Sequence, residues 1–245
     1  MKLNGQSETI ESVNTLTFDI FGTVLDLAGS LVPPLEKLLQ ECNAPESLTG
    51  ADVWNHWRLR QRLEQYQDNI IMLGHSGYLE VKKRALLYTL RLLKIEFTYE
   101  KVDEFMKAYH ELIPFQDAVA GLKRLGTKYR LVILSNGEEW YLKQLVKNNI
   151  GIDFNEILCA EMVSQFKPHP SVYRFAANKL ELEPAQIMMV ASHSFDILGA
   201  RHSGFRAAYV NRYGLPYEES EFRPDITVND FDQLCEKLGL SLIHI

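Results

Sequence analysis

The chain has 245 residues, of which 46% are hydrophobic and 24% charged, and its formal net charge is −6 at pH 7. This length and composition predict one sizeable globular domain, or a domain with an insertion, that can bury a large core. The negative net charge argues against a nucleic-acid-binding surface. The one basic cluster, at Arg58, Arg60 and Arg62, is short and mixed with aromatic residues.

The sequence also bears on compartment and redox state. It has no run of about 18 apolar residues, as a membrane-spanning helix requires, and its polar start, MKLNGQSETIESV, is unlike a secretory signal. We therefore expect a cytoplasmic protein without a membrane partner. Cys42, Cys159 and Cys235 are far apart and share no metal-ligand spacing, so we expect them to be reduced. The terminal SLIHI carries no prediction.

The N-terminal part predicts a strand followed by helices. Residues 13–18 (VNTLTF) are β-branched and aromatic, and the pattern breaks at Gly22, which places Asp19 at the C-terminal end of the strand. From residue 30 to residue 112 apolar residues recur at helical spacing, as in DVWNHWRLRQRLEQY and YLEVKKRALLYTLRLL. The sequence thus predicts a helical block after the first strand.

After Pro114 the expected elements alternate between helix and strand. Such alternation is typical of βαβ units. We predict an α/β fold with a doubly wound, Rossmann-like parallel sheet: residues 1–27 and 114–245 form the core, and residues 28–113 form a helical cap domain inserted after the first strand. The later strands are expected at RLVILS, EILCA, QIMMVAS, FRAAYV and DITV, and the helices near residues 118–125, 139–148, 171–180 and 197–203.

Polar side chains follow three of these strands. Asp19 follows the first strand, Ser135 and Asn136 follow RLVIL, and Ser192 and His193 follow QIMMVA. Because ligands of such sheets bind beyond the carboxyl ends of the strands, these residues predict a pocket. The helical block leaves the same edge and is placed to act as a lid.

Asp19 and Lys167 each have a structural and a functional interpretation. An Asp before a Gly is often only a turn residue, and Lys167, in the loop QFKPHP, could be a solvated lysine. If the two side chains meet, the ammonium keeps the carboxylate ionised. Asp19 could then act as metal ligand, general base or nucleophile.

The segment ASHSFD has the same two interpretations. Ser192 or Ser194 could be the N-cap of a helix with Asp196 in its first turn. Alternatively, His193 or Asp196 could activate a water molecule beside Asp19. The residues leave open which of these two groups would do so.

These motifs resemble, in order and over nearly the whole chain, those of the haloacid dehalogenase superfamily. FDIFGTVLD is similar to its first motif, with Asp19 as nucleophile and Thr23 beside it. LSNG is similar to the second motif, the Lys167 loop to the third, and ASHSFD to the fourth. The resemblance implies a doubly wound α/β core with a cap after the first motif, which agrees with the helical block.

The resemblance leaves a phosphatase and a dehalogenase to be distinguished. Most members of the superfamily are magnesium-dependent phosphohydrolases with acids at the positions that Phe21 and Ser192 occupy here. Magnesium prefers carboxylate ligands, and a halide leaves without being protonated. The substitutions favour a metal-independent dehalogenase without a cofactor. A magnesium-dependent phosphatase acting on a small phosphate ester is the alternative, and a non-catalytic binding protein is the third possibility.

Two further residues resemble the branch that acts on (S)-2-haloacids. Arg58, in WRLRQ, matches an arginine that lies over the halogen, and Tyr173 follows Lys167 by six residues, as in that branch. Without the resemblance, Arg58 would be an exposed helix residue and Tyr173 a packing residue. The implied reaction is attack of Asp19 on C2 of a short 2-haloacid with inversion, followed by hydrolysis of the ester by water.

The resemblance also implies the binding groups. Arg58 and Asn136 would accommodate the halide, while Ser135 and the backbone N–H groups of Ile20 and Phe21 would bind the substrate carboxylate.

The chain also departs from this branch. Ala191, Ser192 and His193 replace Ser-Ser-Asn, and Phe21 replaces a tyrosine. These differences could change the halogen preference, including toward fluoride. The apolar and aromatic content of the helical block favours a homodimer.

Overall fold

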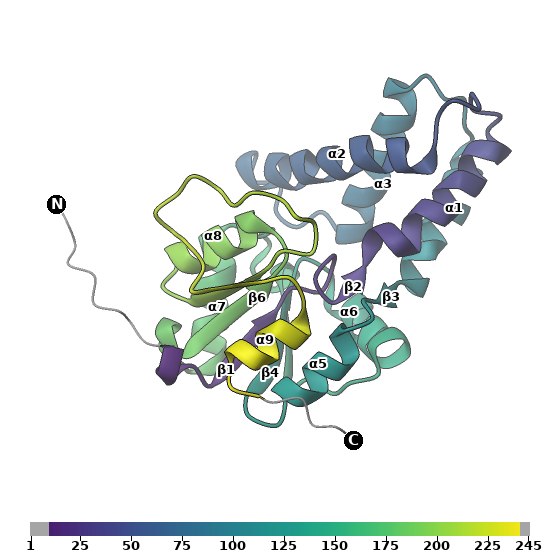
Figure 1. The fold of residues 1–245 in the computed structure, drawn as a ribbon. Helices are drawn as coiled ribbons and strands as arrows, with labels where there is room; N and C mark the ends of the chain where they lie inside the picture. The colour runs from purple at the N-terminus through teal and green to yellow at the C-terminus, as the bar shows by residue number, and fades with distance from the viewer. Residues whose placement is uncertain (1–9, 241–245) are drawn as a thin grey trace.

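The computed structural model describes residues 10–240 as a parallel sheet covered by helices, with a helical insert beside one end of the sheet (Figure 1). The terminal SLIHI segment lies outside the described residues. The strands pair in parallel in the order β5-β4-β1-β6-β7-β8, so the strand order reverses on either side of β1 and the predicted doubly wound fold is confirmed. The strands are β1 (Thr15–Phe18), β4 (Arg130–Ser135), β5 (Glu156–Cys159), β6 (Ile187–Ala191), β7 (Arg206–Val210) and β8 (Ile226–Val228).

Helices cover both faces of this sheet. Along β4, Leu131 and Ile133 belong to the core on one face, and Val132 and Leu134 belong to the core on the other, as the two-residue period of a strand requires. In Figure 1, α5 and α9 lie on one side of the sheet and α7 and α8 on the other. The helices are α5 (Ala118–Leu125), α6 (Glu139–Leu145), α7 (Pro170–Leu180), α8 (Ser194–His202) and α9 (Phe231–Lys237).

The helical insert follows β1, as expected. Its longest helix begins with a capping box, in which Thr49 and Asp52 satisfy each other's backbone N–H groups. A short antiparallel pair at the base of the insert, β2 (Leu25–Asp26) and β3 (Ile113–Pro114), was not predicted. The insert contains α1 (Leu27–Glu41), α2 (Gly50–Ile70), α3 (Tyr78–Leu92), α4 (Tyr99–Met106) and a 3-10 segment, η2 (Lys107–Glu111).

Two predicted helix boundaries need correction. Helix α6 ends at Leu145 and continues as a π-helical turn over Val146–Ile150. Helix α8 begins at Ser194, and its N-cap residue is His193, so the interpretation of Ser192 or Ser194 as N-cap is wrong. The backbone of His193 is extended and its side chain makes no capping hydrogen bond, because the imidazole contacts other groups.

The sequence predicted reduced cysteines and no membrane-spanning helix. Within residues 10–240, none of the helices combines the length and the apolar character that a membrane crossing requires. Cys42, Cys159 and Cys235 are buried free thiols. The homodimer joined through the insert stays a prediction.

Candidate active site

Asp19 lies directly beyond β1, where the backbone turns. Its N–H donates to the carbonyl of Val190 on the neighbouring strand at 3.0 Å. The turn needs glycine at position 22, because φ is +86° and a Cβ there would lie 2.8 Å from the hydroxyl of Tyr213. Within the described chain, no acceptor is found for the N–H groups of Ile20 and Phe21. These donors are therefore available to an anion.

Lys167 joins Asp19 to Asp196. Its Nζ donates to Asp19 Oδ1 at 3.0 Å, to Asp196 Oδ2 at 2.5 Å and to the carbonyl of Leu134 at 2.8 Å. An ammonium has three donors, so the hydrogen-bonding capacity of Lys167 is complete. The side chain is 1% exposed, and the solvated-lysine interpretation is wrong for this position. The backbone N–H of Lys167 donates to the side-chain oxygen of Asn136, which holds the loop against the end of β4.

The two carboxyl groups have pKa values shifted in opposite directions. Burial alone would raise the pKa of Asp19, but the Lys167 ammonium and the His193 ring hold it well below its usual range. For Asp196, burial dominates and the nearby Asp19 charge adds to it, so the pKa rises to about 6 despite Lys167. Asp19 is thus ionised across the physiological range, and Asp196 changes charge near its lower end.

Thr23 and Tyr173 fix the orientation of these carboxylates. The Thr23 hydroxyl donates to Asp19 Oδ2 at 2.9 Å and accepts from the N–H of Ser192 at 2.9 Å, which connects the β1 and β6 loops. The Tyr173 hydroxyl donates to Asp196 Oδ1 at 2.7 Å. Tyr173 is therefore more than a packing residue on α7. The hydroxyl of Ser192 is buried without a partner among the described residues.

His193 lies between Asp19 and Arg58. Its Nε2 is 2.6 Å from Arg58 Nη2, and its Nδ1 is 3.3 Å from Asp19 Oδ2. Because a guanidinium only donates, Nε2 accepts, and the proton of the neutral ring is on Nδ1, facing the carboxylate. Burial, with a smaller contribution from Arg58, lowers the pKa of His193 to about 4 even though Asp19 opposes the shift. The ring is neutral at pH 7.

A cavity separates this sheet edge from the insert. It is narrow, and its lining includes Asp19, Asn136, His193 and Arg58. Phe21 forms one wall and stacks on Tyr78 of α3, with ring centroids 4.0 Å apart. The insert therefore covers Asp19 directly, as the lid expectation requires.

Ser135 ends β4 beside the same strand edge. Its hydroxyl is buried without a hydrogen-bond partner among the described residues. A buried hydroxyl of this kind is costly unless a ligand or water satisfies it. The position therefore fits the predicted contact with a substrate carboxylate.

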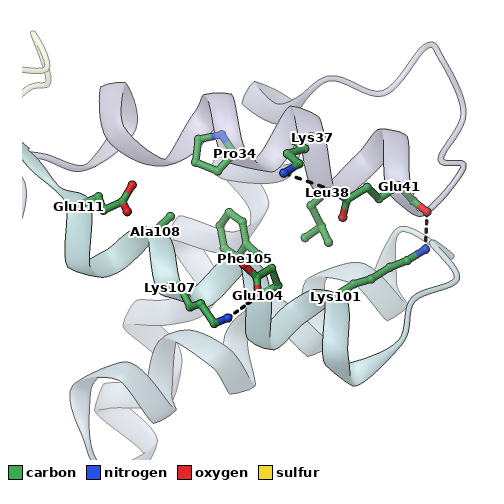
Figure 2. A pocket seen from close by; sticks show the side chains of 10 residues that line it. All are labelled: Pro34, Lys37, Leu38, Glu41, Lys101, Glu104, Phe105, Lys107, Ala108 and Glu111. Carbon is green, nitrogen blue, oxygen red and sulfur yellow. Dashed lines mark hydrogen bonds and ion pairs between the residues drawn. The ribbon is translucent and has the colours of Figure 1, made fainter.

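A different cavity, shown in Figure 2, lies between α1 and the segment that runs from α4 into η2. Most of its charged side chains already have partners. Lys37 is 3.8 Å from Glu41, Lys101 donates to the backbone carbonyl of Glu41, and Lys107 pairs with Glu104. No sequence-predicted site residue lines it, so it is not the candidate site.

The comparison with known proteins agrees with this geometry. A model of the haloacid dehalogenase-like hydrolases matches residues 13–204. The chain belongs to this family. It is 27% identical to (S)-2-haloacid dehalogenase H-109 from Pseudomonas putida, over 94% of this chain and 99% of that protein. It is 30% identical to (S)-2-haloacid dehalogenase 4A from Burkholderia cepacia, over 88% of this chain and 90% of that protein.

Solved structures of this family also resemble the chain. One is the L-2-haloacid dehalogenase from Xanthobacter autotrophicus with chloropropionic acid covalently bound, which is 25% identical with a TM-score of 0.79. The match covers 93% of this chain and 98% of that one. The haloacid dehalogenase-like fold thus extends over the core and the insert together.

Several residues of this haloacid dehalogenase-like site were not predicted. Arg62, Gln65, Tyr78, Lys82 and Phe195 also line the cavity. The spacing gave a signal for Arg62, which lies one helical turn after Arg58 and so on the same face of α2. Nothing in the sequence indicated Tyr78 and Lys82, because their place depends on how the first turns of α3 pack over β1.

Proposed function

We propose that this protein is a metal-independent dehalogenase that converts short 2-haloacids into 2-hydroxyacids, with Asp19 as nucleophile. The observation that carries the proposal is the position of Lys167, whose ammonium bridges Asp19 and Asp196. It keeps the nucleophile ionised and fixed inside a buried site. The similarity to (S)-2-haloacid dehalogenases supports the same reaction class.

The first step is displacement at carbon. An Asp19 oxygen forms a bond to C2 from the side opposite the halogen, and the halide leaves with the bonding electrons, which inverts C2. Ser135 and the N–H groups of Ile20 and Phe21 bind the substrate carboxylate. Arg58 and Asn136 line the cavity where the halide leaves, and the guanidinium stabilises the developing charge.

The second step is hydrolysis of the Asp19 ester. Water adds to the Asp19 carbonyl carbon, the ester bond breaks, and the hydroxyacid leaves with its oxygen bound to C2. Asp196, whose pKa of about 6 leaves it ionised at pH 7, is the better base. The Nε2 of His193 accepts from Arg58, so His193 orients groups and does not take the proton in this arrangement.

The donor set fits a magnesium-dependent phosphatase poorly. The Asp19 and Asp196 carboxylates converge on Lys167 Nζ, whose positive charge already offsets one of their two negative charges. Phe21 and Ser192 supply no carboxylate, and within residues 10–240 no cluster of three or more His, Cys, Asp or Glu side chains could hold a metal ion. This set lacks the charged oxygen ligands that magnesium needs.

Halide release tests the proposal. Purified protein should release chloride or bromide from (S)-2-halopropionate or a haloacetate in the presence of EDTA. Asp19→Asn should lower the rate by at least about three orders of magnitude, as loss of a nucleophile does. Release of phosphate from small phosphate esters only with magnesium would instead support the phosphatase. Well-folded protein that releases no halide from any short 2-haloacid would contradict the proposal.

A further inference from the structure

The wall of the cavity that the insert contributes carries an excess of positive charge. Arg58 and Arg62 on α2 and Lys82 on α3 all line the cavity, and Asp19 is the one carboxylate among the lining residues. Asp19 is already paired with Lys167. A substrate with a single carboxylate would therefore leave part of this cationic wall uncompensated.

Arg62 has an aromatic neighbour where Arg60, on the same helix, has an acid. Its guanidinium lies 4.3 Å from the centre of the Phe195 ring. Among residues 10–240 no ion pair of Arg62 with a carboxylate is found, whereas Arg60 on the same helix binds Glu64 at 2.6 Å. The guanidinium donors of Arg62 are therefore available to a ligand in the cavity.

The amine of Lys82 is buried, and no acid among residues 10–240 forms an ion pair with it. The residue is 1% exposed, and its Nζ lies 4.2 Å from the centre of the Tyr78 ring. Glu138 accepts from the N–H of Tyr78 and makes no ion pair with Lys82 in the described chain. By contrast Lys83, the next residue, is paired with Asp103 at 2.5 Å. Burial is the largest cause that lowers the pKa of Lys82, and Arg58 and Arg62 lower it further.

An unpaired ammonium is costly in a buried site, so an anion bound beside Lys82 and Arg62 would favour the charged form of the lysine. We propose that Arg62 and Lys82 form a second anion subsite, so that the preferred substrates are short 2-halodicarboxylates such as 2-chlorosuccinate. The inference rests on the proposed function and specifies its substrate class. The first carboxylate binds at the sheet edge, and the second binds between α2 and α3.

The reaction is unchanged by the second carboxylate. Asp19 forms the ester bond at C2 as the carbon–halogen bond breaks and the halide leaves, and water then hydrolyses the ester, which releases a 2-hydroxydicarboxylate and one proton. The site cavity adjoins a second, wider cavity, and Arg58, Arg62 and His193 line both. A longer acid could therefore extend from the first cavity toward the second.

A matched pair of substrates tests the inference. (S)-2-chlorosuccinate and (S)-2-chlorobutyrate have the same chain length and differ in the second carboxylate. We expect kcat/KM for the dianion to exceed that for the monoanion by about 10- to 100-fold, the value of one charged hydrogen bond or two. In Arg62→Met and Lys82→Met this ratio should fall toward one. The controls Arg60→Met and Lys83→Met should keep the wild-type ratio.

A second pair of measurements separates the inference from the proposed function. Succinate should inhibit, or bind to, the wild-type protein at least about tenfold more tightly than butyrate, whether or not any haloacid is turned over. Lys82→Met should raise the melting temperature while it removes this difference, which a purely structural lysine would not do. If the protein turns over 2-chlorobutyrate but prefers neither 2-chlorosuccinate to 2-chlorobutyrate nor succinate to butyrate, the proposed subsite is wrong and the dehalogenase proposal stands. If succinate binds more tightly than butyrate but no 2-haloacid releases halide, the dehalogenase proposal is wrong and the subsite stands.

Discussion

The two sides of the cavity differ in whether their charged side chains are paired with an opposite charge. At the sheet edge, each of the three donors of Lys167 has an oxygen acceptor, and Asp19 and Asp196 are both bound. On the insert, Arg62 and Lys82 lie against aromatic rings, and neither forms an ion pair with an acid in the part of the chain that the structure describes. Charged groups that already have hydrogen-bond partners are organised before the substrate arrives. Charged groups without such partners can gain them from a bound ligand. In the proposed reaction the nucleophile and the base lie at the sheet edge, whereas Arg62 and Lys82 of the insert select the substrate.

The largest change we expect comes from Lys167→Met, which removes the ammonium that binds Asp19 and Asp196 at the sheet edge. The variant loses the cation between two buried carboxylates, so halide release should fall by about 100-fold or more. The free energy of unfolding should fall by about 3 to 5 kcal/mol, because the remaining charges are buried and unpaired. Urea unfolding and initial rates measure the two effects. If both the free energy of unfolding and the rate of halide release were those of the wild type, the paired charges at the sheet edge would not have the role that we assign to them.

His193→Asn tests the neutral ring that connects the two sides. The pKa of His193 is lowered to about 4 in the folded protein, whereas in the unfolded chain it is about 6.5. The unfolded state therefore binds the proton first, and stability is lost as the pH falls from about 6.5 to about 4. The raised pKa of Asp196 acts in the opposite direction as the pH falls below about 6.

The comparison of His193→Asn with the wild type isolates the histidine, because Asp196 is present in both. The stability of the variant relative to the wild type should increase by about 3 kcal/mol between pH 7 and pH 4. Urea unfolding at the two pH values measures it. A relative stability that does not change with pH would mean that His193 is not held neutral.

Tyr173→Phe should have the smallest effect of the three. It removes the hydroxyl that donates to Asp196 at 2.7 Å and keeps the ring in the core. A hydrogen bond to a charged group contributes about 1.5 kcal/mol or more, so we expect a comparable loss of stability and a rate about tenfold lower. The acidic limb of the pH–rate profile should also move to higher pH, because Asp196 loses a donor. A profile identical to the wild type would assign Tyr173 to packing alone.

The sequence predicted the sheet-edge side better than the insert side, for a physical reason. Parallel strands bring their carboxyl ends to one edge, so Asp19, Ser135 and His193 could be placed together from strand order and spacing alone. The contact between Lys167 and Asp19 was expected as one of two interpretations, and burial decides between them. The boundary of α8 was misplaced because serines in ASHSFD have high N-cap preference, while the contacts of His193 determine the local backbone.

The insert side depends on packing that periodicity does not specify. The helical pattern predicted α2 and α3 but not which residues face the sheet. Lys82 and Lys83 are adjacent and identical in type, yet one is buried at the cavity and the other reaches Asp103. Only the position of α3 over Phe21 distinguishes them.

We propose that Asp19 itself becomes esterified, and the transfer of an oxygen isotope from water tests this step. Enzyme in excess is allowed a single turnover of (S)-2-chloropropionate in water enriched in oxygen-18, and the peptide that contains Asp19 is then analysed by mass spectrometry. The account predicts one heavy oxygen in Asp19 and none in the lactate released. Heavy oxygen in the lactate with an unlabelled Asp19 would mean that water attacks C2 directly, and would contradict the account.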